Sequence, residues 1–123
     1  MKSSSFFHSV KHALRGVRNA FVHERNFRFQ TTVALVVFAA MIAFPLTTNE
    51  RIILMVVIMS VLVLELLNTT VERLVDLMKP RLIDIAGEIK DLMAAAVLLA
   101  SCFASVIGFV IFWPYLFALL RTL

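Results

Sequence analysis

The chain has 123 residues, of which 61% are hydrophobic, and a formal net charge of +4. With a mean hydropathy of +0.93, this composition excludes an ordinary soluble domain and indicates a small integral membrane protein. No aromatic-basic nucleic-acid motif accompanies the positive charge, so the charge predicts membrane topology and contact with anionic lipid, with no nucleic-acid partner.

A basic amphipathic helix is predicted for residues 5–26. The apolar positions that share one helical face are Phe6, Phe7, Val10, Leu14, Val17 and Phe21. Basic residues such as Lys11, Arg15 and Arg18 lie off this face. A helix of this kind lies in the membrane interface with its apolar side in lipid.

Three apolar segments follow at residues 29–46, 52–77 and 91–120. Each is near or above the ~20 residues that span a bilayer, and the second includes a cytoplasmic extension. Pro45 and the polar turn from Thr47 to Glu50 join the first two spans as a tight hairpin. Pro80 is predicted to end or interrupt the second helix, and residues 81–90 to connect it to the third span. The predicted fold is all-α, with one membrane domain over residues 1–123.

The basic residues predict the orientation of the spans. Of the 12 Lys and Arg residues, all but Arg51 and Arg121 lie before the first span or around the connection between the second and third. Because cytoplasmic loops carry the excess of Lys and Arg, the N-terminus is predicted to be cytoplasmic.

Polar side chains interrupt the second apolar segment at helical spacing: Glu65, Asn68, Thr69, Glu72 and Asp76. At 100° per residue all of them return to within about 60° of Glu65, so they form one stripe. A carboxylate in hydrocarbon costs roughly 2.5–3.5 kcal/mol on insertion scales. The stripe is therefore the candidate functional site.

The other carboxylates on the cytoplasmic side differ from Glu65 in depth. Glu65 lies about 10 Å deeper than Glu72 at 1.5 Å per residue. Acids at the water boundary can hold Mg²⁺ together with nucleotide phosphates, whereas a deeper acid can meet a lipid hydroxyl. Lys90 adds a cation that suits phosphate. The only glycines are Gly16, Gly87 and Gly108, so a glycine-rich phosphate loop is absent.

The segment Glu65-Leu66-Leu67-Asn68-Thr69-Thr70-Val71-Glu72-Arg73-Leu74-Val75-Asp76, followed by Lys90-Asp91 and Ala94-Ala95-Ala96-Val97, resembles the signature of the prokaryotic diacylglycerol kinase family, which includes undecaprenol kinases. Glu24-Arg25-Asn26-Phe27-Arg28 and Lys11-His12-Ala13-Leu14-Arg15-Gly16 resemble the family's segments before its first span. The resemblance covers nearly the whole chain.

The resemblance implies a homotrimer of three-span subunits in the bacterial inner membrane, which transfers the ATP γ-phosphate to a lipid alcohol, either diacylglycerol or undecaprenol. It implies Glu65 as general base with Asn68 in support, and Mg²⁺ on Glu24 and Glu72. The implied ATP-binding residues are His12, Glu24, Glu72, Asp76, Lys90 and Asp91. Arg28 and Glu65 are the implied contacts of the lipid substrate.

The sequence departs from the family pattern at three places. His12 stands where a tyrosine is common, Met93 where a small residue is usual, and Arg81-Leu82-Ile83-Asp84 where the family often has a Tyr-His pair. The contacts of this connecting segment with ATP are therefore left open.

Other interpretations of the stripe remain at this point. Glu65 and Asn68 can form an interhelical hydrogen bond that holds a bundle, and Glu72 and Asp76 can be a solvated helix end paired with Arg73 or Lys79. A small proton-coupled transporter can also use a membrane glutamate such as Glu65. Acids crowded on one face argue against a transport pathway, and an inactive assembly partner is a third interpretation.

Overall fold

The protein is described by a computed structural model that covers residues 2–78, 80–81 and 83–122. Four helices lie within these ranges: α1 (Lys2–His23), α2 (Arg25–Ala43), α3 (Thr48–Met78) and α4 (Ile83–Thr122). No strand occurs in the described ranges. The predicted all-α class is confirmed.

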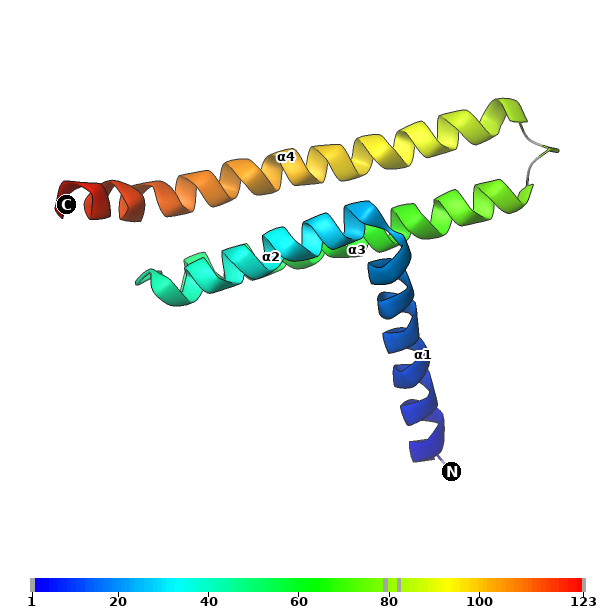
Figure 1. Ribbon diagram of the computed structural model, residues 1–123, viewed down its shortest axis with the longest axis horizontal. Coiled ribbons are helices and arrows are strands. Elements are labelled where there is room, and N and C mark those ends of the chain that lie inside the picture. Colours follow the sequence, from blue (N-terminus) through cyan, green and yellow to red (C-terminus); the bar gives the residue numbers. More distant parts are fainter. Residues whose placement is uncertain (1, 79, 82, 123) are drawn as a thin grey trace.

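Helices α2, α3 and α4 run side by side, and α1 projects sideways from them (Figure 1). Both α2 and α4 pack against α3, whereas α1 contacts α2 and α3 near its C-terminal end. Helices α2, α3 and α4 are each long and apolar enough to cross a membrane. The three predicted spans are confirmed, and the chain is a multi-pass membrane protein.

The chain turns sharply at Glu24, between α1 and α2. Glu24 has φ −105° and ψ 113°, an extended conformation that stops one helix and starts the next. Arg28 stabilises this elbow, since its Nη1 donates to the carbonyl oxygens of Val22 at 2.7 Å and Phe21 at 3.2 Å. These carbonyls lie in the last turn of α1, where helix carbonyls lack intrahelical donors and favour a cation. The contact of Arg28 with lipid substrate remains a prediction.

The turn between α2 and α3 is built by local sequence. Phe44 adopts an extended conformation, as a residue before proline prefers. Thr47 and Glu50 then form a capping box at the start of α3. The Glu50 amide donates to Thr47 Oγ1 at 3.3 Å, and Glu50 Oε2 accepts from the Thr47 amide at 2.7 Å and Thr47 Oγ1 at 2.8 Å.

The same turn is tied to α4 by Tyr115. Its hydroxyl donates to Glu50 Oε2 at 2.7 Å, and its ring lies 6.3 Å from the ring of Phe44. A cluster of buried apolar residues, Met41, Leu46 and Leu54, lies at this end. The end of the bundle opposite α1 is therefore closed by both polar and apolar contacts.

Replacing Tyr115 by Phe removes only this hydroxyl. We expect Tyr115→Phe to unfold at a lower midpoint temperature, or at a lower midpoint concentration of denaturing detergent, than the parent protein. The reason is that Glu50 loses a hydrogen-bond donor while the ring contact with Phe44 is kept. Unfolding followed by circular dichroism in micelles measures the effect, with Trp113→Phe as a control that alters a neighbouring exposed ring. Equal midpoints for Tyr115→Phe and the parent would contradict it.

Helix α4 extends further toward α3's C-terminal end than the sequence indicated. Residues 83–90 belong to α4, although residues 81–90 were predicted as a connection. Ala86 is only 3% exposed, so this segment packs as a helix. Of the residues between α3 and α4, Pro80 and Arg81 are described, whereas Lys79 and Leu82 lie outside the described residues.

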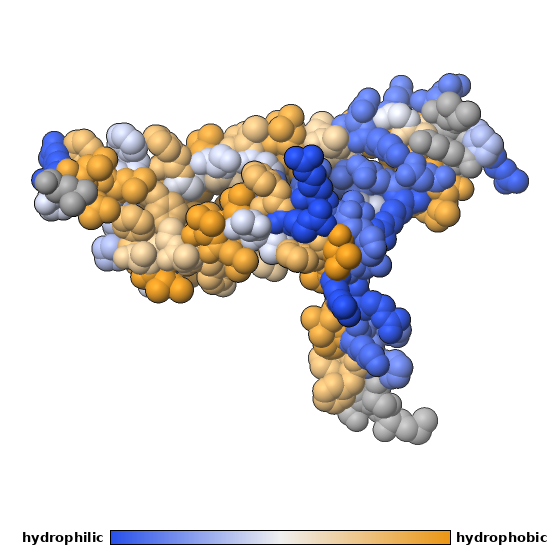
Figure 2. Space-filling view, viewed as in Figure 1, coloured by the Kyte–Doolittle hydropathy of each residue, from blue (hydrophilic) through white to orange (hydrophobic). Residues whose placement is uncertain are grey.

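The outer surface of the spans is apolar. Hydrophilic residues gather at the end where α1 joins, and hydrophobic residues cover most of the spans in the view of Figure 2. None of the most apolar window of α4 is buried within the single chain. Such a surface is stable in contact with lipid tails or with other protein helices, because its exposure to water would be unfavourable in free energy.

Candidate functional site

The polar stripe of α3 lies partly inside the bundle. Glu65 is 3% exposed and Asn68 is 8% exposed, while Glu72 is partly buried and Asp76 is exposed. Asn68 Nδ2 donates to Glu72 Oε1 at 3.1 Å, one helical turn away. The predicted stripe therefore runs from a buried carboxylate to an exposed one along a single helix face.

A cavity of about 310 Å³ opens over this stripe. Its lining comes from α2, α3 and α4: Asn26, Phe29, Gln30, Glu65, Asn68, Glu72, Ala94, Val97, Leu98 and Ser101. Within the described residues, Asn68 Oδ1 is a buried oxygen that receives no hydrogen bond. Since buried polar atoms are normally paired, this oxygen marks a place for a donor or a cation from outside the chain.

Gln30 is a site residue that the sequence reasoning missed. Its Nε2 donates to Ser101 Oγ at 3.1 Å, which joins α2 to α4, and its side chain lines the same cavity as Glu65. The sequence feature that could have identified Gln30 is a single amide side chain inside the first apolar segment. Sequence alone could not pair it with Glu65, which lies on another helix.

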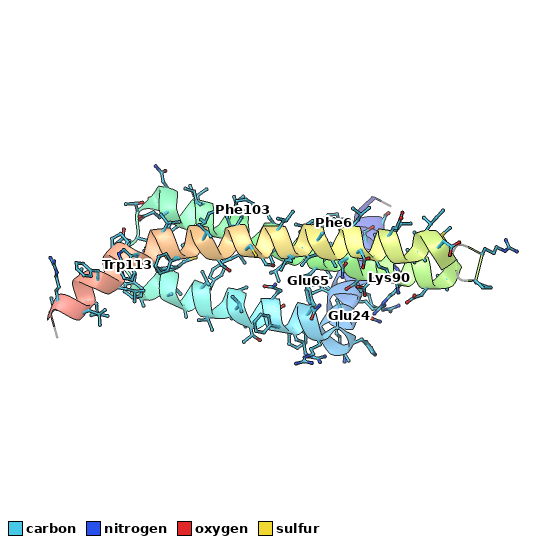
Figure 3. All side chains as sticks on the ribbon, turned by 90° about the horizontal axis from the view of Figure 1, so that it is seen from above. Phe6, Glu24, Glu65, Lys90, Phe103 and Trp113 are labelled. Atoms are coloured by element: carbon cyan, nitrogen blue, oxygen red, sulfur yellow. The ribbon has the colours of Figure 1, made fainter. Side chains whose placement is uncertain are left out.

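Lys90 and Asp76 join α4 to α3 beyond the cavity. Lys90 Nζ lies 2.6 Å from Asp76 Oδ1. Glu24, Glu65 and Lys90 all lie toward the end of the bundle where α1 joins (Figure 3). Asp91, next to Lys90, is exposed. The cationic and anionic side chains predicted to handle phosphate thus occupy one end of the molecule.

Glu24 lies at the elbow and pairs with Arg73 of α3, whose Nη2 is 2.9 Å from Glu24 Oε1. Glu24 is not among the residues that line the cavity. Arg73 was considered a partner of Glu72 or Asp76; the structure instead pairs it with Glu24, and pairs Asp76 with Lys90.

His12 is placed apart from the cavity. It lies eleven residues before the end of α1, about 17 Å along the helix axis at 1.5 Å per residue. Its exposed ring lies 5.7 Å from that of His8, on the helix that projects from the bundle. A contact between His12 and a nucleotide stays a prediction.

The acids of the site do not form a protein-only metal cage. Among the described residues, no group of three or more His, Cys, Asp or Glu side chains is close enough to hold a metal ion. Mg²⁺ is commonly held by one or two carboxylates together with substrate phosphates and water. Glu72 and the unpaired Asn68 oxygen lie at the same cavity, whereas Glu24 lies outside its lining, so Mg²⁺ binding by Glu24 and Glu72 stays a prediction.

The fold and the cavity define a class: a multi-pass, all-helical membrane protein with a buried carboxylate site near one end of its spans. The family model of prokaryotic diacylglycerol kinase matches residues 11–112. The chain belongs to the prokaryotic diacylglycerol kinase family, as the sequence resemblance indicated. Membership indicates a prokaryotic lipid kinase, and the transporter interpretation is set aside.

Individual relatives agree with this assignment. The undecaprenol kinase of Bacillus subtilis (strain 168) is 36% identical over 111 residues, which cover 90% of each chain. The diacylglycerol kinase of Haemophilus influenzae is 35% identical over 105 residues, covering 80% of this chain and 84% of the relative. The diacylglycerol kinase of Escherichia coli (strain K12) is 27% identical over 101 residues, covering 82% and 83%.

Proposed function

We propose that this protein transfers the γ-phosphate of ATP to the hydroxyl group of a membrane lipid alcohol in the presence of Mg²⁺. The observation that carries the proposal is the burial of Glu65 in a cavity that also contains Asn68 and Glu72. A buried carboxylate within a membrane-spanning helix is costly and is typical of a functional group. We place the protein in the bacterial inner membrane, with its N-terminus in the cytoplasm.

Glu65 acts as the general base in this proposal. Its carboxylate accepts the proton of the lipid hydroxyl as the hydroxyl oxygen attacks the γ-phosphorus and the bond to the β-phosphate oxygen breaks. Gln30 and Asn68 line the same cavity and orient the carboxylate and the hydroxyl. Orientation of this kind supplies much of the rate in phosphoryl transfer, because the reaction needs positioned groups and charge stabilisation.

Glu24 and Glu72 are proposed to hold the metal with the nucleotide phosphates. A bound Mg²⁺ neutralises the charge that develops on the phosphate oxygens. Lys90 adds a positive charge at the same end of the bundle, where Asp76 holds its ammonium group. Asp91 and the exposed Asp76 complete the proposed nucleotide end of the site, and His12 is the proposed contact on α1.

An apolar groove supports a lipid as the acceptor. The groove, of about 570 Å³, lies between α2 and α4 and shares Phe29, Gln30 and Ser101 with the cavity. It continues along the spans as far as Leu116. A lipid chain in this groove has its hydroxyl end at the level of Gln30, beside Glu65. A soluble alcohol would gain nothing from such a groove.

The working unit is proposed to be a homotrimer. In the single chain much of the apolar surface of the spans stays exposed, including Phe103 at 66% and Phe109 at 63%. A chain of 123 residues that binds two substrates also benefits from a neighbouring subunit at its open cavity.

The assay that tests the proposal offers diacylglycerol and undecaprenol in parallel, since relatives carry both names. We expect the purified protein in micelles to transfer label from γ-labelled ATP to one of the two lipids, and to stop when EDTA removes Mg²⁺. Preference for one lipid assigns the substrate. Folded protein that labels neither lipid would overturn the proposal.

A further inference from the structure

Arg73 connects three parts of the chain at the cytoplasmic end of α3. Its Nη1 and Nη2 each lie 3.2 Å from Asn19 Oδ1, in the last turns of α1. Its Nη2 also donates to Glu24 Oε1 at 2.9 Å, at the elbow between α1 and α2. One guanidinium group on α3 thus holds both α1 and the residue that joins α1 to α2.

The bridge that Arg73 forms to Asn19 and Glu24 orients the Glu24 side chain. Glu24 is the N-cap residue of α2, yet its carboxylate makes no capping hydrogen bond with that helix. Arg28 holds only the backbone of the elbow, through the carbonyls of Phe21 and Val22. Among the described residues, Arg73 is the partner that sets the direction of the carboxylate.

The chemistry of arginine suits this task. Its planar guanidinium presents donors in a fixed fork, so that it can serve an amide oxygen and a carboxylate at the same time. The pair is half open to solvent, with the side chain of Arg73 52% exposed and that of Glu24 28% exposed. Exposed ion pairs have small effects, so the bridge is expected to tune the geometry of the site and not to hold the fold together.

We propose that Arg73 is a positioning residue, which fixes the Glu24 carboxylate and the end of α1 against α3 and thereby sets the affinity for Mg·ATP. The inference rests on the proposed role of Glu24 as a metal ligand. Arg73 occupies Oε1 of Glu24, and the second oxygen of the same carboxylate would be left to hold the metal. Arg73 itself touches neither substrate, so its loss affects binding more than turnover.

The test uses Arg73→Ala, Arg73→Lys and Asn19→Ala in the full chain, with Arg15→Ala as the matched control. Arg15 is an exposed residue of α1 that makes no hydrogen bond or ion pair among the described residues. The first measurement is amide hydrogen exchange at residues 19–24 in nucleotide-free protein. The second separates KM for Mg·ATP from kcat, and Glu24→Gln is assayed in parallel.

We expect Arg73→Ala to raise KM for Mg·ATP by about fivefold, the upper range for an exposed pair, with kcat within about twofold. Exchange at the elbow should rise in the same variant. Arg73→Lys should recover part of the affinity, because an ammonium can reach Glu24 but cannot fork to both partners. Asn19→Ala should loosen the end of α1 while it changes KM less.

Two outcomes overturn the inference. If Arg73→Ala behaves like Arg15→Ala in both hydrogen exchange and KM for Mg·ATP, the bridge does not position Glu24. Faster exchange with an unchanged KM shows that the bridge is structural only. If Glu24→Gln itself leaves KM unchanged, the proposed metal role of Glu24 fails, and the exchange data still decide whether Arg73 anchors the elbow.

Discussion

Replacement of Glu65 by Gln is expected to reduce phosphate transfer to lipid by about 10²–10⁴-fold, the range that a positioned general base contributes. Gln keeps the size of the side chain and a hydrogen-bonding oxygen, but it cannot accept the proton of the lipid hydroxyl. Because Glu65 is 3% exposed and lies in the cavity between three helices, an isosteric replacement should leave the bundle folded.

The measurement is single-turnover transfer of labelled phosphate to the preferred lipid, together with Mg·ATP binding by the same preparation. Glu65→Gln should bind Mg·ATP within about twofold of the parent, since the base contributes little to nucleotide affinity. Glu65→Asp is a useful companion because it keeps the charge and shortens the reach. Turnover of Glu65→Gln close to that of the parent would rule out the base role.

Replacement of Glu72 by Gln is expected to raise the Mg²⁺ concentration needed for half-maximal activity by at least about tenfold. Residues that only support metal ligands already change affinity by 10–100-fold, so loss of a charged ligand should do no less. Gln keeps an oxygen that can accept from Asn68 Nδ2, as Glu72 Oε1 does at 3.1 Å. The local structure of α3 should therefore be retained.

A Mg²⁺ titration at saturating ATP measures this effect, and Mn²⁺ binding followed by electron paramagnetic resonance gives a second readout without turnover. Glu88→Gln is the control, since Glu88 is an exposed acid near the start of α4 and its replacement removes the same charge. An unchanged Mg²⁺ requirement in Glu72→Gln would remove Glu72 from the metal site. A similar shift in Glu88→Gln would indicate a general charge effect.

Much of the fold followed from patterns within single helices. Three apolar segments predicted three spans, and the bundle of α2, α3 and α4 confirms them. The boundaries were less certain, because a helix that crosses a membrane need not end at its surface. Residues 83–90 illustrate this: their charges suggested a connection, yet they continue α4, where Ala86 is buried.

The candidate site was likewise predicted only in part from the sequence. Glu65, Asn68 and Glu72 share a face of one helix, so their spacing alone placed them together. Gln30 and Ser101 lie on two other helices. The spacing of residues within either helix does not predict the hydrogen bond between them. The partner of Arg73 was left open by the sequence, because a guanidinium can reach many acids, and only the elbow at Glu24 brings one of them to 2.9 Å.

The sequence by itself determined the membrane class, the three spans and the polar stripe, because each depends on hydropathy and on the 3.6-residue period of one helix. Only the tertiary structure decided which helices close the cavity over Glu65, which acid pairs with Arg73 or Lys90, and how Tyr115 reaches Glu50. The reason is physical: these contacts depend on how helices are placed beside one another, and the periodicity of a single helix carries no information about its neighbours.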